Sequence, residues 1–103
     1  NQFKNLPESI GKLSSLRDLS AGGNALILLP EQITDLNQLT QLDLSSNQLK
    51  NLPTLFGNLS NLYDLNLYGN QLQALPESFG NLTNLQDLAL SGNKLSSLPE
   101  SFG

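Results

Sequence analysis

Acidic side chains recur at a fixed distance along this chain, and they are the residues most able to do chemistry. Asp64 and Asp87 are 23 positions apart, and Asp18 precedes Asp64 by 46 positions. Paired carboxylates can transfer protons in catalysis, coordinate a calcium ion, or attract a positively charged protein surface. These kinds of chemistry need different surroundings, so the elements that hold the aspartates decide between them.

Other reactive groups are scarce. The chain has no histidine, no cysteine, no nucleophile elbow and no phosphate-binding glycine loop, so we expect no catalytic site and no cofactor. Neither the EF-hand nor the nonapeptide calcium repeat is present, and we therefore expect no metal site. A net charge of −4 with scattered lysines argues against nucleic-acid binding.

The sequence also lacks the features of a membrane or secreted protein. No apolar run approaches the roughly 20 residues that span a bilayer, so we expect no membrane insertion. No signal-like segment opens the chain, and the absence of cysteine fits a reducing compartment. These observations favour a cytoplasmic location.

A 23-residue unit repeats along the chain without slippage. Of the 103 residues, 26 are leucines, and one repeated residue type implies one repeated packing environment. We therefore expect a single repeat domain over residues 1–103, a piece of a longer array whose uncapped ends allow self-association. Full copies occupy 16–38, 39–61 and 62–84, and partial copies occupy 1–15 and 85–103.

Each unit predicts a short strand, a turn and a short helical return. In the copy 62–84, Leu65 and Leu67 alternate with polar residues, as in a strand with one buried face. Asn70 follows at a turn, where its side chain can hydrogen-bond main-chain groups. Pro76 then suits the first turn of a short helical or 3₁₀ segment that buries Phe79. Stacked coils place one asparagine per copy in a structural ladder: Asn1, Asn24, Asn47, Asn70 and Asn93.

The motif L-x-x-L-x-L-x-x-N-x-L resembles that of leucine-rich repeat proteins. The 23-residue form with L-P-x-x-F-G-N-L is similar to repeats of intracellular Ras-binding scaffolds, Roco GTPases and many bacterial proteins. The resemblance implies an α/β fold: a right-handed curved solenoid with a parallel β-sheet on its concave face and short helical, 3₁₀ or turn segments on its convex face. The resemblance does not fix a function, and our preferred hypothesis is a non-catalytic protein-binding module that binds through its concave sheet. The alternatives are a regulatory or dimerising arm of a Roco-type GTPase, or a bacterial effector or surface protein.

The concave face is where this resemblance places the polar strand residues. Three aspartates in one row would attract a protein partner with a basic surface, whereas an ordinary solvated face is the alternative. Tyrosine is enriched at binding hot spots and favours the first interpretation. The predicted partner-binding residues are Asp18, Gln41, Asp43, Tyr63, Asp64, Asn66, Tyr68 and Asp87.

The first full copy departs from the pattern in its core. Ala21 stands where the other copies have leucine, and Ile27 and Leu28 stand where they have mostly polar residues. An unfilled leucine-sized gap costs about 2–5 kcal/mol. We therefore expect Ile27 or Leu28 to tilt inward and fill it, the alternative being that both form an apolar surface patch.

Overall fold

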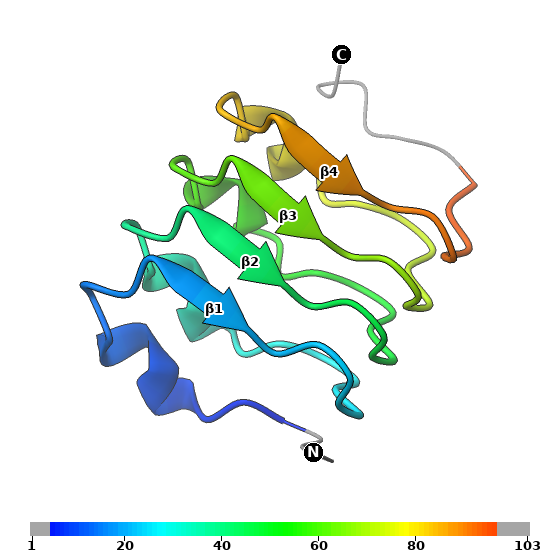
Figure 1. Ribbon diagram of the computed structural model, residues 1–103, viewed down its shortest axis with the longest axis horizontal. Helices are drawn as coiled ribbons and strands as arrows, with labels where there is room; N and C mark the ends of the chain where they lie inside the picture. The colour runs from blue at the N-terminus through cyan, green and yellow to red at the C-terminus, as the bar shows by residue number, and fades with distance from the viewer. Residues whose placement is uncertain (1–4, 97–103) are drawn as a thin grey trace.

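The protein is a stack of similar coils, which the computed structural model describes over residues 5–96. Successive coils contribute the strands β1 (Asp18–Ser20), β2 (Gln41–Asp43), β3 (Asp64–Asn66) and β4 (Asp87–Ala89). The strands pair in parallel in chain order, each residue lying beside the one 23 positions further on (Figure 1). The predicted parallel sheet of stacked coils is therefore confirmed.

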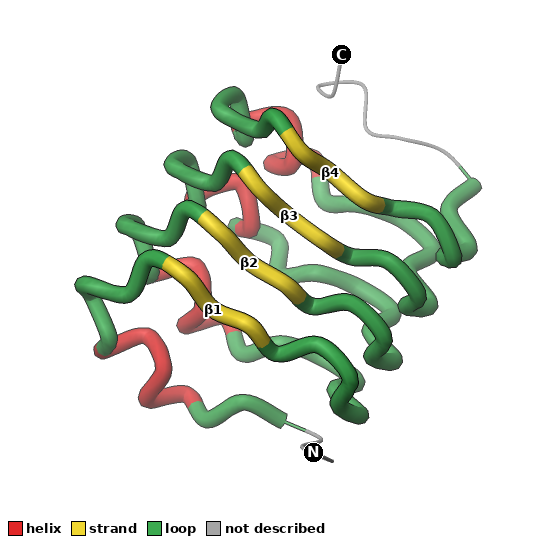
Figure 2. Tube along the Cα trace, viewed as in Figure 1, coloured by secondary structure: helices red, strands yellow, loops and turns green. Residues whose placement is uncertain are grey.

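Short 3₁₀ helices form the second layer, on the other side of the coils from the strands (Figure 2). The prolines precede these helices instead of lying in their first turn. Pro76, for example, is the N-cap of its helix with φ −67° and ψ 153°, and its carbonyl accepts the Phe79 N–H at 2.9 Å. An extended proline that supplies the first acceptor fits the fixed φ of its ring. The helices are η1 (Glu8–Lys12), η2 (Glu31–Asp35), η3 (Phe56–Asn58) and η4 (Glu77–Asn81).

A continuous core runs between the two layers. Leu65 and Leu67 are fully buried beneath the sheet, as their alternation predicts. On the helix side, the rings of Phe56 and Phe79 stack with centroids 6.2 Å apart and planes 7° from parallel. Aromatic pairs of this kind contribute about 0.5–1.5 kcal/mol beyond their buried area.

The helix η3 is shorter than its neighbours because a serine from the next coil replaces the hydrogen bond that would follow the one from the Phe56 N–H to the Pro53 carbonyl. The Ser78 hydroxyl accepts the Gly57 N–H at 2.9 Å and donates to the Thr54 carbonyl at 2.7 Å. These are the two groups that a 3₁₀ turn would pair with each other. The exchange links the copies 39–61 and 62–84 directly.

Asparagine side chains hold the turn after each strand. Asn70 is buried; its amide group donates to the carbonyls of Leu44, 2.9 Å away, and Leu67, 3.1 Å away, and its Oδ1 accepts the Leu49 N–H at 3.1 Å. Asn70 therefore bonds its own coil and the preceding one. Asn47 and Asn93 repeat the arrangement, whereas Asn24 donates to the carbonyls of Ala21 and Gly22 in its own coil. Asn1 lies outside the described residues.

In the first full copy, the space beside Ala21 is not filled by Ile27 or Leu28 as expected. Ile27 and Leu28 remain 45% and 58% exposed, so the expectation that one of them tilts inward is wrong. Ala21 is itself buried, and its N–H donates to the Asp43 carbonyl at 2.8 Å. The side chains of Ile27 and Leu28 both point outward and form an apolar surface instead.

Candidate functional site

The outward side of β1 to β4, here termed the sheet face, carries a shallow hollow of about 290 Å³ over the first three strands. Successive strand residues point to opposite sides, so Asp64 and Asn66 face outward while Leu65 between them is buried. Five of the eight predicted partner-binding residues meet in this hollow. Its lining consists of Asp18, Ser20, Gln41, Leu42, Asp43, Asp64 and Asn66.

Carboxylates form a row across the strands of the sheet face. The register places Asp18, Gln41, Asp64 and Asp87 side by side on β1 to β4. Adjacent strands lie about 4.8 Å apart, so Asp64 and Asp87 are near neighbours, whereas Gln41 separates Asp64 from Asp18. Two solvated carboxylates at this spacing repel each other by about 1 kcal/mol or less. A cation brought to the row would relieve this repulsion.

The two tyrosines lie at opposite ends of β3. Tyr63 precedes the strand, and its hydroxyl accepts a hydrogen bond of 2.6 Å from the Gln41 side-chain amide. This bond holds its ring toward β2, beside the acidic row. Tyr68 follows the strand and is 52% exposed, against 37% for Tyr63. Neither tyrosine lines the hollow, and Asp87 also lies outside it.

Two of the predicted site residues also shape the ends of their own strands. One Asp43 carboxylate oxygen accepts both the Ser45 N–H, at 3.0 Å, and the Ser45 hydroxyl, at 2.7 Å. The Asn66 side-chain oxygen likewise accepts the Tyr68 N–H at 3.0 Å. Aspartate and asparagine side chains commonly form such hydrogen bonds with the residue two positions ahead. These two side chains are consequently less free to meet a partner than Asp18 or Asp64.

Sequence reasoning missed two residues of the hollow. Ser20 lies in the same row as Asp43 and Asn66, so its position in the repeat was the only signal that it lines the hollow. Leu42 has no such signal, because its position in the repeat predicts burial, and its side chain is in fact only 2% exposed and packs in the core. The side chains that surround the hollow are therefore polar and acidic.

The surroundings of the acidic residues are open and solvated. Over residues 5–96, no three histidine, cysteine, aspartate or glutamate side chains gather closely enough to hold a metal ion. In the same part of the chain, every buried side-chain nitrogen or oxygen has a hydrogen-bond partner. No helix within the described residues is long and apolar enough to cross a bilayer. What the arrangement offers chemically is a negatively charged surface for association.

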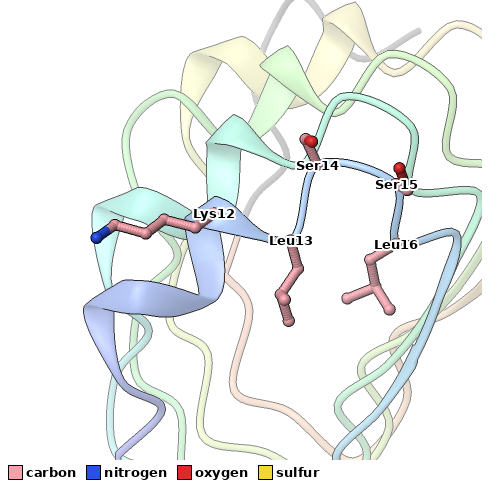
Figure 3. A pocket seen from close by; sticks show the side chains of 5 residues that line it. All are labelled: Lys12, Leu13, Ser14, Ser15 and Leu16. Atoms are coloured by element: carbon pink, nitrogen blue, oxygen red, sulfur yellow. The ribbon is translucent and has the colours of Figure 1, made fainter.

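A second hollow, of about 420 Å³, lies where the described coils begin, after η1 (Figure 3). Leu13 and Leu16 point to the same side of the chain there, and Lys12 extends away from them. Leu13 is 53% exposed, whereas Leu36, one repeat later and between two coils, is fully buried. The hollow therefore lies at the end of the described stack, where no described coil packs over Leu13.

Comparisons with known proteins agree on one family. Two family models, both described as leucine-rich repeat, match residues 52–95 and 38–59. Among solved structures, a leucine-rich repeat protein of Leptospira interrogans is 40% identical with a TM-score of 0.95, over 98% of this chain and 26% of that one. A search of the curated proteins finds no match.

Two further solved structures show the same coils in different settings. The plant peptide hormone receptor RGFR1, solved in complex with RGF2, is 35% identical with a TM-score of 0.85, over 94% of this chain and 16% of that one. The protein InlP of Listeria monocytogenes is 37% identical with a TM-score of 0.77, over 91% of this chain and 26% of that one. The present chain therefore spans about a quarter or less of each of these structures.

Proposed function

The chain belongs to the leucine-rich repeat family, and we propose that it is a non-catalytic module that binds a protein partner across its sheet face. The observation that carries this proposal is the hollow over β1 to β3, where Asp18 and Asp64 stand on either side of Gln41. A hollow lined by carboxylates suits the charged end of a lysine or arginine side chain.

Residues that recur in every coil form the scaffold, whereas residues that differ between coils lie on the surface. The buried leucines and Asn70 recur from coil to coil because every coil needs them to stack. The outward positions carry no such requirement and differ between strands: aspartate, glutamine, aspartate and aspartate in the acidic row. Their individual identities are therefore available for recognition, and Tyr63, fixed by Gln41, adds a rigid aromatic side chain.

A basic partner is the finer part of the proposal. The four aspartates of the sheet face would raise the rate of encounter with a lysine- or arginine-rich surface, an effect that falls as salt screens the charges. The plant receptor that this chain resembles was solved with a ligand bound, which supports a protein or peptide as the class of partner.

A charge reversal at Asp64 tests the binding face. We expect Asp64→Lys to weaken binding of a labelled lysine-rich peptide about tenfold, or roughly 1.4 kcal/mol, because it places a cation at the centre of the acidic row. The matched control is Asp35→Lys, which changes the net charge equally but lies on η2 in the helix layer. Fluorescence anisotropy at low and moderate salt gives both affinities, with a glutamate-rich peptide of equal length as the negative probe.

Equal weakening by both charge reversals would contradict the proposal, because it would show that only net charge matters. Tyr63→Ala provides a second check that leaves the charge unchanged. Weaker binding in this variant, with unchanged thermal unfolding, is the expected result. Binding that is unaffected by both Tyr63→Ala and Asp64→Lys would exclude the sheet face.

The setting of the module in a longer protein is a separate part of the proposal. We propose that residues 1–103 belong to a longer leucine-rich repeat array, because the similar structures extend well beyond the matched coils. Similarity to Leptospira and Listeria proteins favours the bacterial alternative. The Roco-type arm, self-association and a cytoplasmic location stay predictions from the sequence.

A further inference from the structure

An apolar groove of about 460 Å³ lies away from the sheet, along the segments that lead into the 3₁₀ helices. It shares no lining residue with the hollow of the sheet face. Its apolar lining consists of Leu28, Leu29, Pro30, Leu52 and Pro53. Its volume falls within the range of sites that take an apolar ligand group.

Leu28 is an addition to this groove that the fold does not require. Leu29 beside it is buried in the core, whereas Leu28 is 58% exposed. The same slot holds Asn51 one repeat later and Ala74 two repeats later. In the corresponding groove one coil further on, Asn51 takes the place of Leu28, and the volume is only about 250 Å³. A feature present in one coil and absent from its neighbours serves something other than stacking.

The groove also carries negative charge. Glu8 and Glu31, the first residues of η1 and η2, both line it. No lysine or arginine is among the described residues that line it. In the next groove, Thr54 stands in the slot of these glutamates. The exposed leucine and the carboxylates thus coincide in one place, and the described residues that line the groove that follows include neither.

We propose that this groove binds a segment of a partner protein in which an aliphatic side chain is flanked by lysine or arginine. The aliphatic group covers Leu28 and sits between Pro30 and Pro53, while the flanking cations meet Glu8 and Glu31. Burial of the exposed leucine supplies attraction, and the two carboxylates select a basic segment over a neutral one. This site is independent of the sheet face and can be occupied at the same time.

The test compares two neighbouring positions in the complete chain. Leu28→Asn introduces the residue found at this slot in the next coil, and Ile27→Gln introduces the residue found at its slot two coils later. Both replaced side chains are exposed and both changes are neutral in charge, but only Leu28 lines the groove. The probes are three short synthetic peptides with the centres Arg-Leu-Arg, Arg-Ala-Arg and Glu-Leu-Glu. Binding is measured by NMR titration of the leucine and isoleucine methyl groups.

The expected result is that only the Arg-Leu-Arg peptide shifts the methyl signals of Leu28 and Leu52. Leu28→Asn should weaken this peptide about tenfold, Ile27→Gln should leave it unchanged, and Glu8→Gln with Glu31→Gln should remove its salt dependence. Equal binding of the Arg-Ala-Arg peptide, or shifts confined to Leu42 and Leu65, which pack directly beneath the sheet face, would overturn the proposal. Sedimentation that shows dimers of the wild-type chain and monomers of Leu28→Asn would also overturn it, because a second copy would then be the occupant.

Discussion

Gly57→Ala is expected to destabilise the protein by about 3 kcal/mol, near the upper end for overpacking a core. An added Cβ would overlap the Ser78 carbonyl oxygen and lie 2.6 Å from the Ser78 carbonyl carbon. Both are main-chain atoms of the next coil, so the coils would have to move apart. The change would also disturb the bond from the Gly57 N–H to the Ser78 hydroxyl.

The sign of this stability change distinguishes a steric clash between coils from the ordinary effect of alanine on backbone propensity. Replacing glycine by alanine at an unstrained position normally stabilises a protein by about 0.4–1 kcal/mol. Gly57 does not have a positive φ, so backbone propensity alone predicts a gain. Urea denaturation monitored by circular dichroism measures the difference, and a variant as stable as wild type would contradict the close approach of the two coils.

Gly23→Ala is the matched control for that measurement. Gly23 has a φ of +72°, but no other part of the chain lies within 4 Å of the position that an added Cβ would take. Its replacement therefore adds backbone strain of about 1–2 kcal/mol without a steric clash. We expect Gly57→Ala to be the more damaging of the two changes.

Asn70→Asp is expected to cost at least about 3 kcal/mol, although it preserves the shape of the side chain. The carboxylate would still accept the Leu49 N–H, but its second oxygen would face the carbonyls of Leu44 and Leu67, to which the amide now donates. Each carbonyl would lose one of its two side-chain donors, keeping only Asn47 or Asn93, and a negative charge would be buried beside them. Burying a charge that faces two carbonyl oxygens is more costly than losing an average hydrogen bond.

Differential scanning calorimetry of Asn70→Asp should therefore show a melting temperature far below that of the wild type. Asn61→Ala serves as the control, since it removes one exposed bond, from the Asn61 amide to the Asn37 carbonyl, in the same repeat unit as Asn47. A change of about 0.5 kcal/mol or less is expected there. Similar losses in the two variants would show that the buried position of Asn70 is unimportant.

The repeated residues made the fold predictable, because they report the requirements of every coil. Leu65 and Leu67 alternate with polar residues and form a strand with one buried face, as expected. The helical return after Pro76 was also predictable, although proline precedes the helix instead of entering it. A constant period fixes the register, since each strand residue pairs with the one 23 positions later.

Contacts between unlike residues of different coils were not predictable. The Ser78 hydroxyl shortens η3 because it reaches Gly57 and Thr54 in the preceding coil, and no pattern within one repeat encodes this. The direction of Ile27 and Leu28 was predicted wrongly for a related reason. The small side chain of Ala21 led to the prediction that Ile27 or Leu28 packs inward to fill the space. The path of the backbone there instead directs both side chains to the surface.

The rows of residues in the candidate site were predictable, but the shape of its surface was not. The period alone groups Asp18, Asp64 and Asp87 in one row. The hollow ends before Asp87, and the bond between Gln41 and Tyr63 depends on side-chain geometry across two strands. The turn bonds of Asp43 show that one residue can serve the fold and the surface together.

Carboxyl footprinting of the chain with a bound protein partner tests the central claim most directly. The partner is first captured on the immobilised chain and purified, and carbodiimide labelling is then quantified by mass spectrometry with and without it. The claim predicts lower labelling at the sheet face, at Asp18, Asp64 and Asp87, with unchanged labelling of Asp35 on η2. Unchanged labelling of Asp64 in the saturated complex would contradict it.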